Sequence, residues 1–329
     1  MSKGIIFEQL LAEKYMSRCL LLAKNGRYGA PPNPMVGAVI VHGERIIGEG
    51  YHARCGEAHA EVSAVNSVKP EDKALLPEST IYVSLEPCAH YGKTPPCAEL
   101  IIKTGIPRVV VGCVDSFAKV KGKGVSMLRD AGVQVIVGVL EDECRSLNKK
   151  FFTFHEKKRP YVTLKWARSA DGYIDLIRND GEAAKLSTPH TMLRVHRLRA
   201  EHQAILVGHN TLLLDHPHLN VVHWDGPQPL KCVLGHVPQE ELPEGFETFE
   251  SAETLLASLY ERQIQSLLVE GGRKTLQFFI DNGLWDEAHE ECSAKVLGSG
   301  VEAPEMPLDD CEEEEIWNVT IKHYKNIKQ

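Results

Sequence analysis

Short apolar runs alternate with helical patterns along this chain, and this alternation restricts the fold more than any other feature of the sequence. Residues 36–41 and 46–51 are apolar runs separated by His42-Gly43-Glu44-Arg45, which predicts a β-hairpin. Helices are then expected from about residue 59, after residue 96 and at 124–131, alternating with strands at 80–84, 108–112 and 133–137. The alternation predicts a largely parallel sheet covered by helices on both faces.

A helix is expected before this region, and a second α/β pattern follows it. Leu11, Tyr15, Cys19 and Leu22 recur at helical spacing within residues 7–24, and Asn25-Gly26 predicts that a left-handed residue ends this helix. In the second half we expect strands at 161–166, 204–207, 230–234 and 266–269, and helices at about 188–201, 252–262 and 274–282. The acidic run at 309–315 is expected to be a solvated surface segment.

The length and a local change in pattern indicate two domains. The 329 residues are enough for two cores at roughly 150 residues per domain. An aromatic cluster and the basic run Lys157-Lys158-Arg159-Pro160 lie between residues 149 and 160, just before a new strand. We therefore expect one α/β domain at residues 1–150 and another at 151–329.

Composition excludes several classes of partner. The formal net charge is −8, and no long basic tract offers the electrostatic footprint of a nucleic-acid-binding protein. No apolar run reaches the roughly 18 to 20 residues that cross a bilayer, and the N-terminus lacks the apolar region of a signal peptide. We expect a cytoplasmic protein without a nucleic-acid or membrane partner. A homodimer is left open, and an exposed apolar strand edge would favour it.

The cysteines point to metal binding and apolar packing rather than disulfides. Their number is odd, at nine, and a reducing compartment would not keep a disulfide framework. Cys19, Cys113 and Cys232 lie in apolar periodic segments, where a free cysteine usually packs as a small hydrophobic residue.

The strongest chemical signal is His59-Ala60-Glu61, followed by Pro87-Cys88 and Pro96-Cys97. One imidazole and two thiolates suit zinc, and three protein ligands leave the fourth tetrahedral position open for water, as in catalytic sites. Glu61 lies two residues beyond His59 and is expected beside that water, where it can carry protons to a leaving amine. The pattern is typical of zinc deaminases, which remove an exocyclic amine from a nitrogen heterocycle.

A closed structural zinc site is the alternative interpretation. Cys55 or His52 would then supply a fourth ligand, because both lie just upstream of the motif. This alternative leaves Glu61 without a role. His90, between the two cysteines, is another candidate, although a lone histidine in a loop is more often a polar surface or substrate group.

The spacing of the motif resembles one family. Cys88 and Cys97 are separated by eight residues in Cys88-Ala89-His90-Tyr91-Gly92-Lys93-Thr94-Pro95-Pro96-Cys97, whereas cytidine and nucleic-acid deaminases usually carry Cys-x-x-Cys. With Asn33-Pro34-Met35-Val36-Gly37 upstream, the segment resembles the bifunctional riboflavin-biosynthesis deaminase/reductases, and the resemblance extends over nearly the whole chain.

The resemblance implies a cytidine-deaminase-like α/β/α domain of three layers at the N-terminus. It implies that a diamino-phosphoribosylamino-pyrimidine is deaminated at Zn²⁺ held by His59, Cys88 and Cys97, with Glu61 as the proton shuttle. Asn33 would bind the pyrimidine, since an amide side chain offers both a donor and an acceptor to a heterocycle edge. Without the resemblance, Asn33 is a turn residue before a proline.

The second half carries motifs that look like the reductase domain of the same family. They are Pro160-Tyr161-Val162-Thr163-Leu164-Lys165, Ser169-Ala170-Asp171-Gly172, His196-Arg197-Leu198-Arg199-Ala200, Asp215-His216-Pro217 and Leu268-Val269-Glu270-Gly271-Gly272. The resemblance implies a dihydrofolate-reductase-like α/β fold that uses NADPH to reduce the ribosyl group of the deaminated product to ribityl.

Roles for individual reductase residues follow from the same resemblance. The NADPH site would be lined by Arg168, Thr211, Asp215, Gly271, Gly272 and Arg273, and the substrate site by Lys165, Leu219 and Glu270. From the residues alone, the glycine pair is weak evidence: it places backbone N–H groups at a helix start, where a phosphate binds well, but a tight turn needs it equally. Lys165 and Asp171 are alternatively a strand-end pair.

Two departures from the family pattern raise a second hypothesis. Met192 and Val222 stand where arginines are usual, and loss of a guanidinium weakens phosphate binding. The alternative is therefore an active deaminase whose reductase domain is impaired or serves only as a scaffold.

Overall fold

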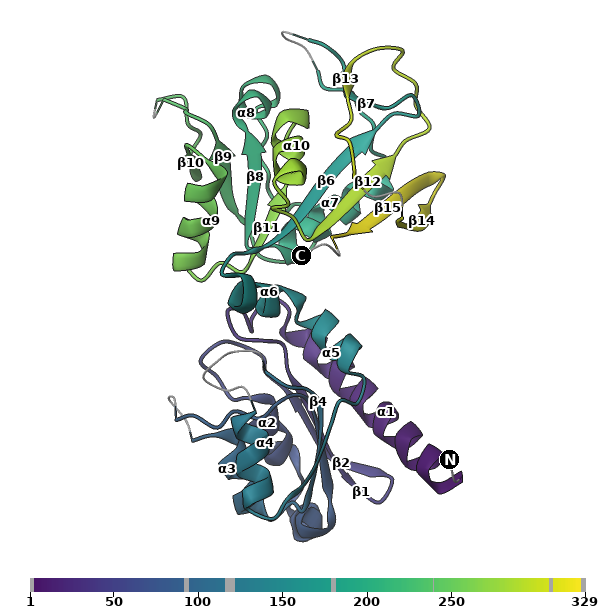
Figure 1. The fold of residues 1–329 in the computed structure, drawn as a ribbon, viewed down its shortest axis with the longest axis vertical. Coiled ribbons are helices and arrows are strands. Elements are labelled where there is room, and N and C mark those ends of the chain that lie inside the picture. Colours follow the sequence, from purple (N-terminus) through teal and green to yellow (C-terminus); the bar gives the residue numbers. More distant parts are fainter. Residues whose placement is uncertain are drawn as a thin grey trace. The chain divides into compact units, whose positions relative to one another are not determined.

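Two sheets organise the chain, one in each of two units, Met1–Lys157 and Lys158–Gln329 (Figure 1). The computed structural model describes residues 3–91, 95–115, 122–178, 182–238, 240–307 and 310–326, with the side chains of residues 3–7 left aside. The division expected after residue 150 falls within α6 (Lys149–Lys157), which belongs to the first unit.

The sheet of the first unit is mixed rather than largely parallel. Its strand order is β2-β1-β3-β4-β5, from β1 (Gly37–His42), β2 (Arg45–Tyr51), β3 (Thr80–Leu85), β4 (Arg108–Cys113) and β5 (Gln134–Val137). β1 pairs antiparallel with both β2 and β3, and the two remaining pairings are parallel. The predicted hairpin of β1 and β2 is confirmed. The expectation of a largely parallel sheet was wrong here, because β1 runs antiparallel to both of its neighbours.

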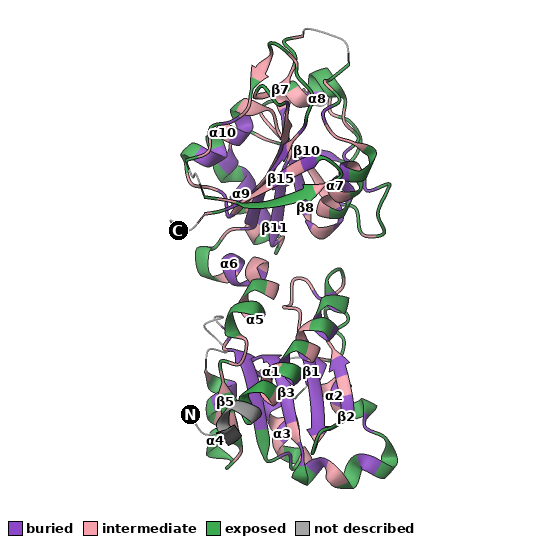
Figure 2. Ribbon diagram, turned by 90° about the vertical axis from the view of Figure 1, so that its right-hand side faces the viewer, coloured by how far each residue is buried: buried purple, intermediate pink, exposed green. Residues whose placement is uncertain are grey.

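Helices cover both faces of this sheet, which gives the expected three layers. One face packs α2 (Ala60–Ser67), α3 (Cys97–Thr104) and α4 (Lys123–Asp130) against side chains such as Ile40 and Val83. The other packs α1 (Lys3–Ala23), α5 (Glu141–Leu147) and α6 against the alternate residues, such as Val39 and Val110. The buried residues therefore follow the strands, as Figure 2 shows. Two 3₁₀ segments, η1 (Lys24–Gly26) and η2 (Pro70–Glu78), complete the unit.

The end of α1 corrects one expectation. Gly26 does not adopt the left-handed conformation, because η1 continues with right-handed backbone into Arg27. A Cβ at Gly26 would lie 2.4 Å from the carbonyl oxygen of His52. Glycine is needed here for close backbone approach rather than for a positive φ.

The second unit is built on an eight-stranded sheet with the order β10-β9-β8-β11-β6-β12-β15-β14. Its strands are β6 (Tyr161–Arg168), β8 (Ala204–Gly208), β9 (Leu230–Leu234), β10 (Phe246–Phe249), β11 (Ser266–Val269), β12 (Glu287–Cys292), β14 (Glu312–Ile316) and β15 (Val319–Lys325). All pairings from β10 to β12 are parallel, and β15 and β14 add an antiparallel edge. A small separate pair joins β7 (Tyr173–Asp175) to β13 (Val301–Glu302).

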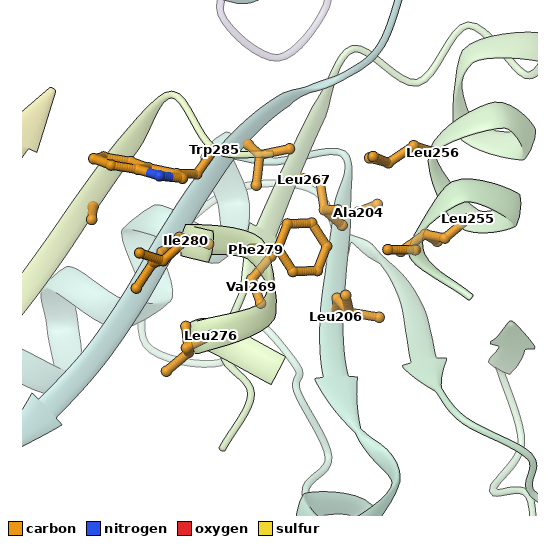
Figure 3. Close-up of a cluster of buried hydrophobic side chains, with 14 of the residues drawn as sticks. Ala204, Leu206, Leu255, Leu256, Leu267, Val269, Leu276, Phe279, Ile280 and Trp285 are labelled. Atoms are coloured by element: carbon orange, nitrogen blue, oxygen red, sulfur yellow. The ribbon is translucent and has the colours of Figure 1, made fainter. Parts of the chain in front are cut away.

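Four helices flank this sheet. α9 (Ala252–Glu261) and α10 (Arg273–Asp281) pack on one face, and α7 (Pro189–Glu201) and α8 (His209–Asp215) contribute to the other. The larger core is centred on Phe279, whose ring lies among Ala204, Leu206, Leu267 and Val269 (Figure 3). Cys232 belongs to this core and is fully buried, as its predicted apolar role requires.

The acidic run near the C-terminus is exposed, as expected, and most of it forms the edge strand β14. Residue 309 lies outside the described residues. In β14, Glu312 pairs with Lys325, Glu313 with Lys322 and Glu314 with Arg194. This edge therefore presents charge, which discourages edge-to-edge pairing.

No described helix combines the length and the apolar character that crossing a membrane requires.

Candidate functional site

The three predicted metal ligands come from the starts of two helices and the end of one strand. His59 is the residue before α2, Cys97 is the first residue of α3, and Cys88 lies three residues after β3. The amide of Ala98 donates to the carbonyl oxygen of Cys88 at 3.1 Å, which holds the segment after β3 against the start of α3. His59 and Cys97 each lie at the start of a helix, and the Ala98–Cys88 hydrogen bond holds Cys88 beside the start of α3. Three distant parts of the sequence therefore meet at one point.

The donor atoms of these residues face one another. His59 Nδ1 lies 3.6 Å from Cys88 Sγ and 3.3 Å from Cys97 Sγ, and all three donor atoms lie within 4.8 Å of one another. The Cys97 amide also donates to Cys88 Sγ at 3.3 Å. Hydrogen bonding with the Cys97 side chain, and with His59, lowers the pKa of Cys88 against the opposing effect of burial. One nitrogen and two sulfurs, with a thiol that ionises readily, fit zinc.

Glu61 lies beside this group. It belongs to the first turn of α2, its side chain is buried, and it hydrogen bonds with Cys97. Burial, followed by the nearby charge of Cys88, raises the pKa of Glu61 to about 7. A carboxyl group that titrates near neutral pH can both accept and donate a proton at working pH, which general acid–base catalysis needs.

The alternative of a closed site finds no fourth ligand among the described residues. The group that could hold a metal there contains neither His52 nor Cys55. His52 uses Nδ1 to donate to the carbonyl oxygen of Ala58 at 3.0 Å, so its Nε2 accepts from Asn33 Nδ2, also at 3.0 Å. Cys55 is exposed, and His90 is exposed as well.

The same contacts link Asn33 to the metal ligands. The His52 ring stands edge-on to the His59 ring, with centroids 5.3 Å apart. Because the Asn33 amide nitrogen donates to His52, the oxygen of the same amide remains to accept a hydrogen bond from a ligand. Sequence reasoning considered His52 only as a ligand and missed this orienting contact, which no spacing in the sequence reveals.

A second residue that sequence reasoning missed is Glu86, directly before Pro87-Cys88. Its buried carboxylate accepts from the amides of Gly124 at 2.9 Å, Gly122 at 3.0 Å, Val125 at 3.1 Å and Asp115 at 3.3 Å. These bonds tie the segment that carries Cys88 to the start of α4. The signal available in the sequence was an acidic residue placed between an apolar strand and the Pro-Cys pair.

In the second unit, the residues expected to bind NADPH lie where three neighbouring parallel strands end: Arg168 is the last residue of β6, and the others follow β8 and β11. Thr211 lies in α8 after β8, and Gly271-Gly272 joins β11 to α10. A Cβ at Gly272 would lie 3.4 Å from Thr211 Oγ1, and one at Gly271 would lie 2.8 Å from Thr275 Cβ. No side chain caps the start of α10. The start of α10 is therefore uncapped and lies at the carboxyl edge of the sheet. Helix starts in this position commonly bind phosphate groups.

The charged residues expected here all form internal ion pairs. Asp215 pairs with Arg178, Arg273 contacts Glu302 at 2.5 Å, and Arg168 Nε contacts Glu290 Oε1 at 2.6 Å. Arg178, from the segment after β7, also contacts Asp175 at 2.9 Å. A ligand that binds these side chains must share them with their present ion-pair partners or displace those partners.

The residues expected at the substrate divide into two groups. Glu270, at the end of β11, pairs with Arg199 of α7 at 2.7 Å, and Lys165 of β6 is close enough to act on Glu270 electrostatically. Burial alone would raise the pKa of Glu270, but the charges of Arg199 and Lys165 outweigh it and lower the pKa. Leu219, in contrast, is buried in the core beside Leu212 and Val237.

The two positions without arginine lie near α7. Met192 is partly exposed within the helix, and Val222 is 68% exposed. The Val222 amide donates to His196 Nδ1 at 3.2 Å, which anchors this segment to α7.

Comparisons with known proteins agree with this architecture unit by unit. A family model described as the cytidine and deoxycytidylate deaminase zinc-binding region matches residues 10–113, and the RibD C-terminal domain model matches residues 160–327. The fold and these matches define a deaminase domain joined to a reductase domain.

Relatives match over almost the full length. The riboflavin biosynthesis protein RibD of Aquifex aeolicus is 36% identical over 335 residues, covering 92% of each chain, and that of Escherichia coli K12 is 34% identical over 87% of this chain and 89% of the relative. A solved diaminohydroxyphosphoribosylaminopyrimidine deaminase/5-amino-6-(5-phosphoribosylamino)uracil reductase from Thermotoga maritima is 35% identical, with a TM-score of 0.86 and coverage of 97% and 99%.

The chain belongs to the RibD family, the bifunctional deaminase/reductases of riboflavin biosynthesis. The alternative of a second domain that is only a scaffold is not favoured, because the reductase model matches nearly the whole of that domain.

Proposed function

We propose that this chain deaminates 2,5-diamino-6-(5-phosphoribosylamino)pyrimidin-4(3H)-one in its first unit and then uses NADPH to reduce the ribosyl group of the product to ribityl in its second. The observation that carries the proposal is the group of His59, Cys88 and Cys97 with Glu61 buried beside it. Both reactions correspond to the two activities by which the Thermotoga relative is named.

In the deaminase unit, His59, Cys88 and Cys97 would hold zinc, which supplies a Lewis acid that activates water at neutral pH. Glu61 would accept a proton from the water that adds to the amine-bearing carbon of the pyrimidine, and it would donate a proton to the amine, which leaves as ammonia when the carbon–nitrogen bond breaks. Asn33 reads the edge of the pyrimidine with its amide, held in one orientation by His52.

In the reductase unit, Thr211, Asp215 and the Gly271-Gly272 turn with Arg273 would receive NADPH, and Arg168 would lie beside its nicotinamide. NADPH supplies the hydride, so the chain's own task is to orient donor and acceptor and to stabilise developing charge. Lys165 and Glu270, which lie close together, would contact the ribosyl group. Leu219, which is buried in the core, would line the inner wall of the substrate site.

The proposal places this work in the cytoplasm, where the free cysteines stay reduced.

The test is a coupled assay of zinc-loaded protein on the diaminopyrimidine substrate that follows ammonia release and NADPH absorbance together. We expect ammonia to appear and NADPH to disappear in equal amounts. Glu61→Gln should abolish both signals, and addition of the deaminated intermediate, 5-amino-6-(5-phosphoribosylamino)uracil, should restore NADPH loss alone. Ammonia without NADPH loss would contradict the reductase half, and the absence of both signals in the unaltered protein would contradict the whole proposal.

A further inference from the structure

A two-pronged ion pair joins α7 to the carboxyl end of β11. Arg199 Nε donates to Glu270 Oε1 at 3.2 Å, and Nη2 donates to Oε2 at 2.7 Å. The side chains expose only 14% and 10% of their surface. Arg199 Nη1 donates to the carbonyl oxygen of Asn220 at 3.3 Å. With three nitrogens engaged, the guanidinium plane is fixed, and it fixes the plane of the carboxylate in turn.

The position of Glu270 is set from its backbone as well. Its amide donates to the carbonyl oxygen of Leu206 at 2.9 Å, continuing the pairing of β11 with β8. Lys165 and His196 are the other groups whose charge acts on the carboxylate beside that of Arg199. Glu270 is therefore an ionised acid surrounded by basic groups, at the edge of the sheet where parallel strands end.

The pair leaves part of the carboxylate unused. An ionised carboxylate has about four lone-pair positions, and Arg199 occupies one on each oxygen. One position on each oxygen remains, and the two point outward on opposite sides of the carboxylate, so each can accept a hydrogen bond from one hydroxyl group. The ribosyl group of the proposed substrate carries hydroxyl groups.

We propose that Arg199 is a positioning residue that holds Glu270 so that its carboxylate accepts a hydrogen bond from a hydroxyl group of the ribosyl group. The inference rests on the proposed function, since it specifies how the reductase unit recognises its substrate. It also assigns a task to the second arginine of the motif His196-Arg197-Leu198-Arg199-Ala200.

A merely structural ion pair is the competing explanation, and the chain offers a matched control. Arg262 forms a similar two-pronged contact with Glu247, at 2.6 and 3.2 Å, but both side chains are about two-fifths exposed. Glu247 lies in the edge strand β10, three strands from β11, and Arg262 follows α9. Arg262→Met removes a guanidinium fork without touching the proposed site. Any effect shared by both variants is structural.

The experiment measures NADPH oxidation with supplied 5-amino-6-(5-phosphoribosylamino)uracil in the full-length protein, for Arg199→Met, Arg199→Lys and Arg262→Met. NADPH affinity and thermal unfolding are followed in parallel. We expect Arg199→Met to raise KM for the intermediate about tenfold or more and to lower kcat, since small misplacement of a positioned group costs up to about 100-fold. Arg199→Lys should recover only part of this, because lysine keeps the charge but not the fork. Arg262→Met should match the unaltered protein.

A pH profile separates positioning from simple support. Without the guanidinium, burial acts on Glu270 against the charges of Lys165 and His196 alone, so the acid limb of kcat/KM should move to higher pH in Arg199→Met. In a Glu270→Gln background, Arg199→Met should add little further loss, since the two residues act as one unit.

Three results bear on the inference. A rise in KM with an unmoved Kd for NADPH and a displaced acid limb supports it. Equal kinetics for Arg199→Met and Arg262→Met overturn it while the reductase function stands. If the unaltered protein does not oxidise NADPH with the supplied intermediate, the proposed function itself fails, and the inference falls with it.

Discussion

The two units prepare their chemistry in opposite ways. In the first unit, His59, Cys88 and Cys97 face one another at 3.3 to 3.6 Å from the imidazole nitrogen. In the second, the charged residues at the expected site are bound by protein partners, such as Arg178 on Asp215 and Glu290 on Arg168. A metal centre needs only a few donor atoms at one point. A site for two large ligands is spread over the ends of several strands, and its charged side chains need protein partners of opposite charge until the ligands bind.

The largest effect that separates the units is expected from Glu61→Gln. The variant keeps the shape of the side chain but removes the proton shuttle, so ammonia release should fall by about 10²- to 10⁴-fold. Reduction of supplied deaminated intermediate should not change, because the residue belongs to the first unit. Zinc content, measured after gel filtration, controls for loss of metal. A variant with near-normal ammonia release would remove Glu61 from the mechanism.

A core substitution tests the units in terms of stability. Phe279→Ala removes the ring at the centre of the larger core and should lower the unfolding free energy of the second unit by about 3–5 kcal/mol. We expect the reductase to lose heat resistance while ammonia release persists to the temperature seen for the unaltered chain. Calorimetry and both assays over a temperature series measure this. Equal loss of both activities would show that the two units do not unfold separately.

The glycine pair offers a smaller and sharper test. A Cβ at Gly271 would meet Thr275 Cβ at 2.8 Å, which forces a shift at the start of α10, so Gly271→Ala should destabilise the second unit by about 1–3 kcal/mol. Gly272→Ala meets Thr211 Oγ1 only at 3.4 Å and should leave stability within about 0.5 kcal/mol.

Cofactor binding distinguishes the same two variants. If the turn receives NADPH, Gly272→Ala should raise the Kd for NADPH although the unit remains stable, since the added methyl group lies where the backbone must approach a phosphate. Fluorescence titration with NADPH measures this. An unchanged Kd would place the cofactor elsewhere.

The smallest effect concerns pH. Hydrogen bonding by Ser169, and by the amides of Leu297 at 3.1 Å and Gly298 at 2.7 Å, lowers the pKa of Asp171 to about 2. An unfolded aspartate has a pKa near ~3.9. A lowered folded pKa stabilises the fold above pH ~4, and the contribution is lost as pH falls toward about 2.

This pH dependence has a direct measurement. Carboxyl chemical shifts should give Asp171 a midpoint near 2, and Asp171→Asn should flatten the stability curve between pH 4 and 2. A midpoint near 4 would mean that the segment around residue 297 does not hold this carboxylate in solution.

Local sequence patterns predicted most of the regular elements. The hairpin of β1 and β2, the helix that begins at His59 and the strands β3, β4, β6, β8, β9 and β11 all lie within a few residues of their expected positions. The additional strands β12 and β15, and the helices α5 and α6, were not predicted. In β12 the buried positions include Glu290 and Glu291, so this strand lacks an apolar pattern, and α6 lies within the segment that was interpreted as the boundary between the domains.

The metal group was within reach of the sequence because the chemistry of its residues is unusual and their spacing is short. Thiols and an imidazole next to Pro-Cys pairs have few other uses together. The family resemblance predicted most of the candidate reductase residues. Neither the resemblance nor the spacing of the motifs showed that Leu219 is buried in the core or that Arg199 forms an ion pair with Glu270. Ion pairs between residues 71 positions apart leave no periodic signal.

The sequence by itself determined most of the regular elements, the two α/β units and the candidate donor set for a metal, because these depend on periodicity and on the intrinsic chemistry of nearby side chains. Only the tertiary structure decided the mixed pairing of the first sheet, the orientation of Asn33 by His52 and the partners of each charged residue at the second site. Those features depend on which strand lies beside which and on how much water each side chain loses. Both are properties of the packed chain rather than of any local segment.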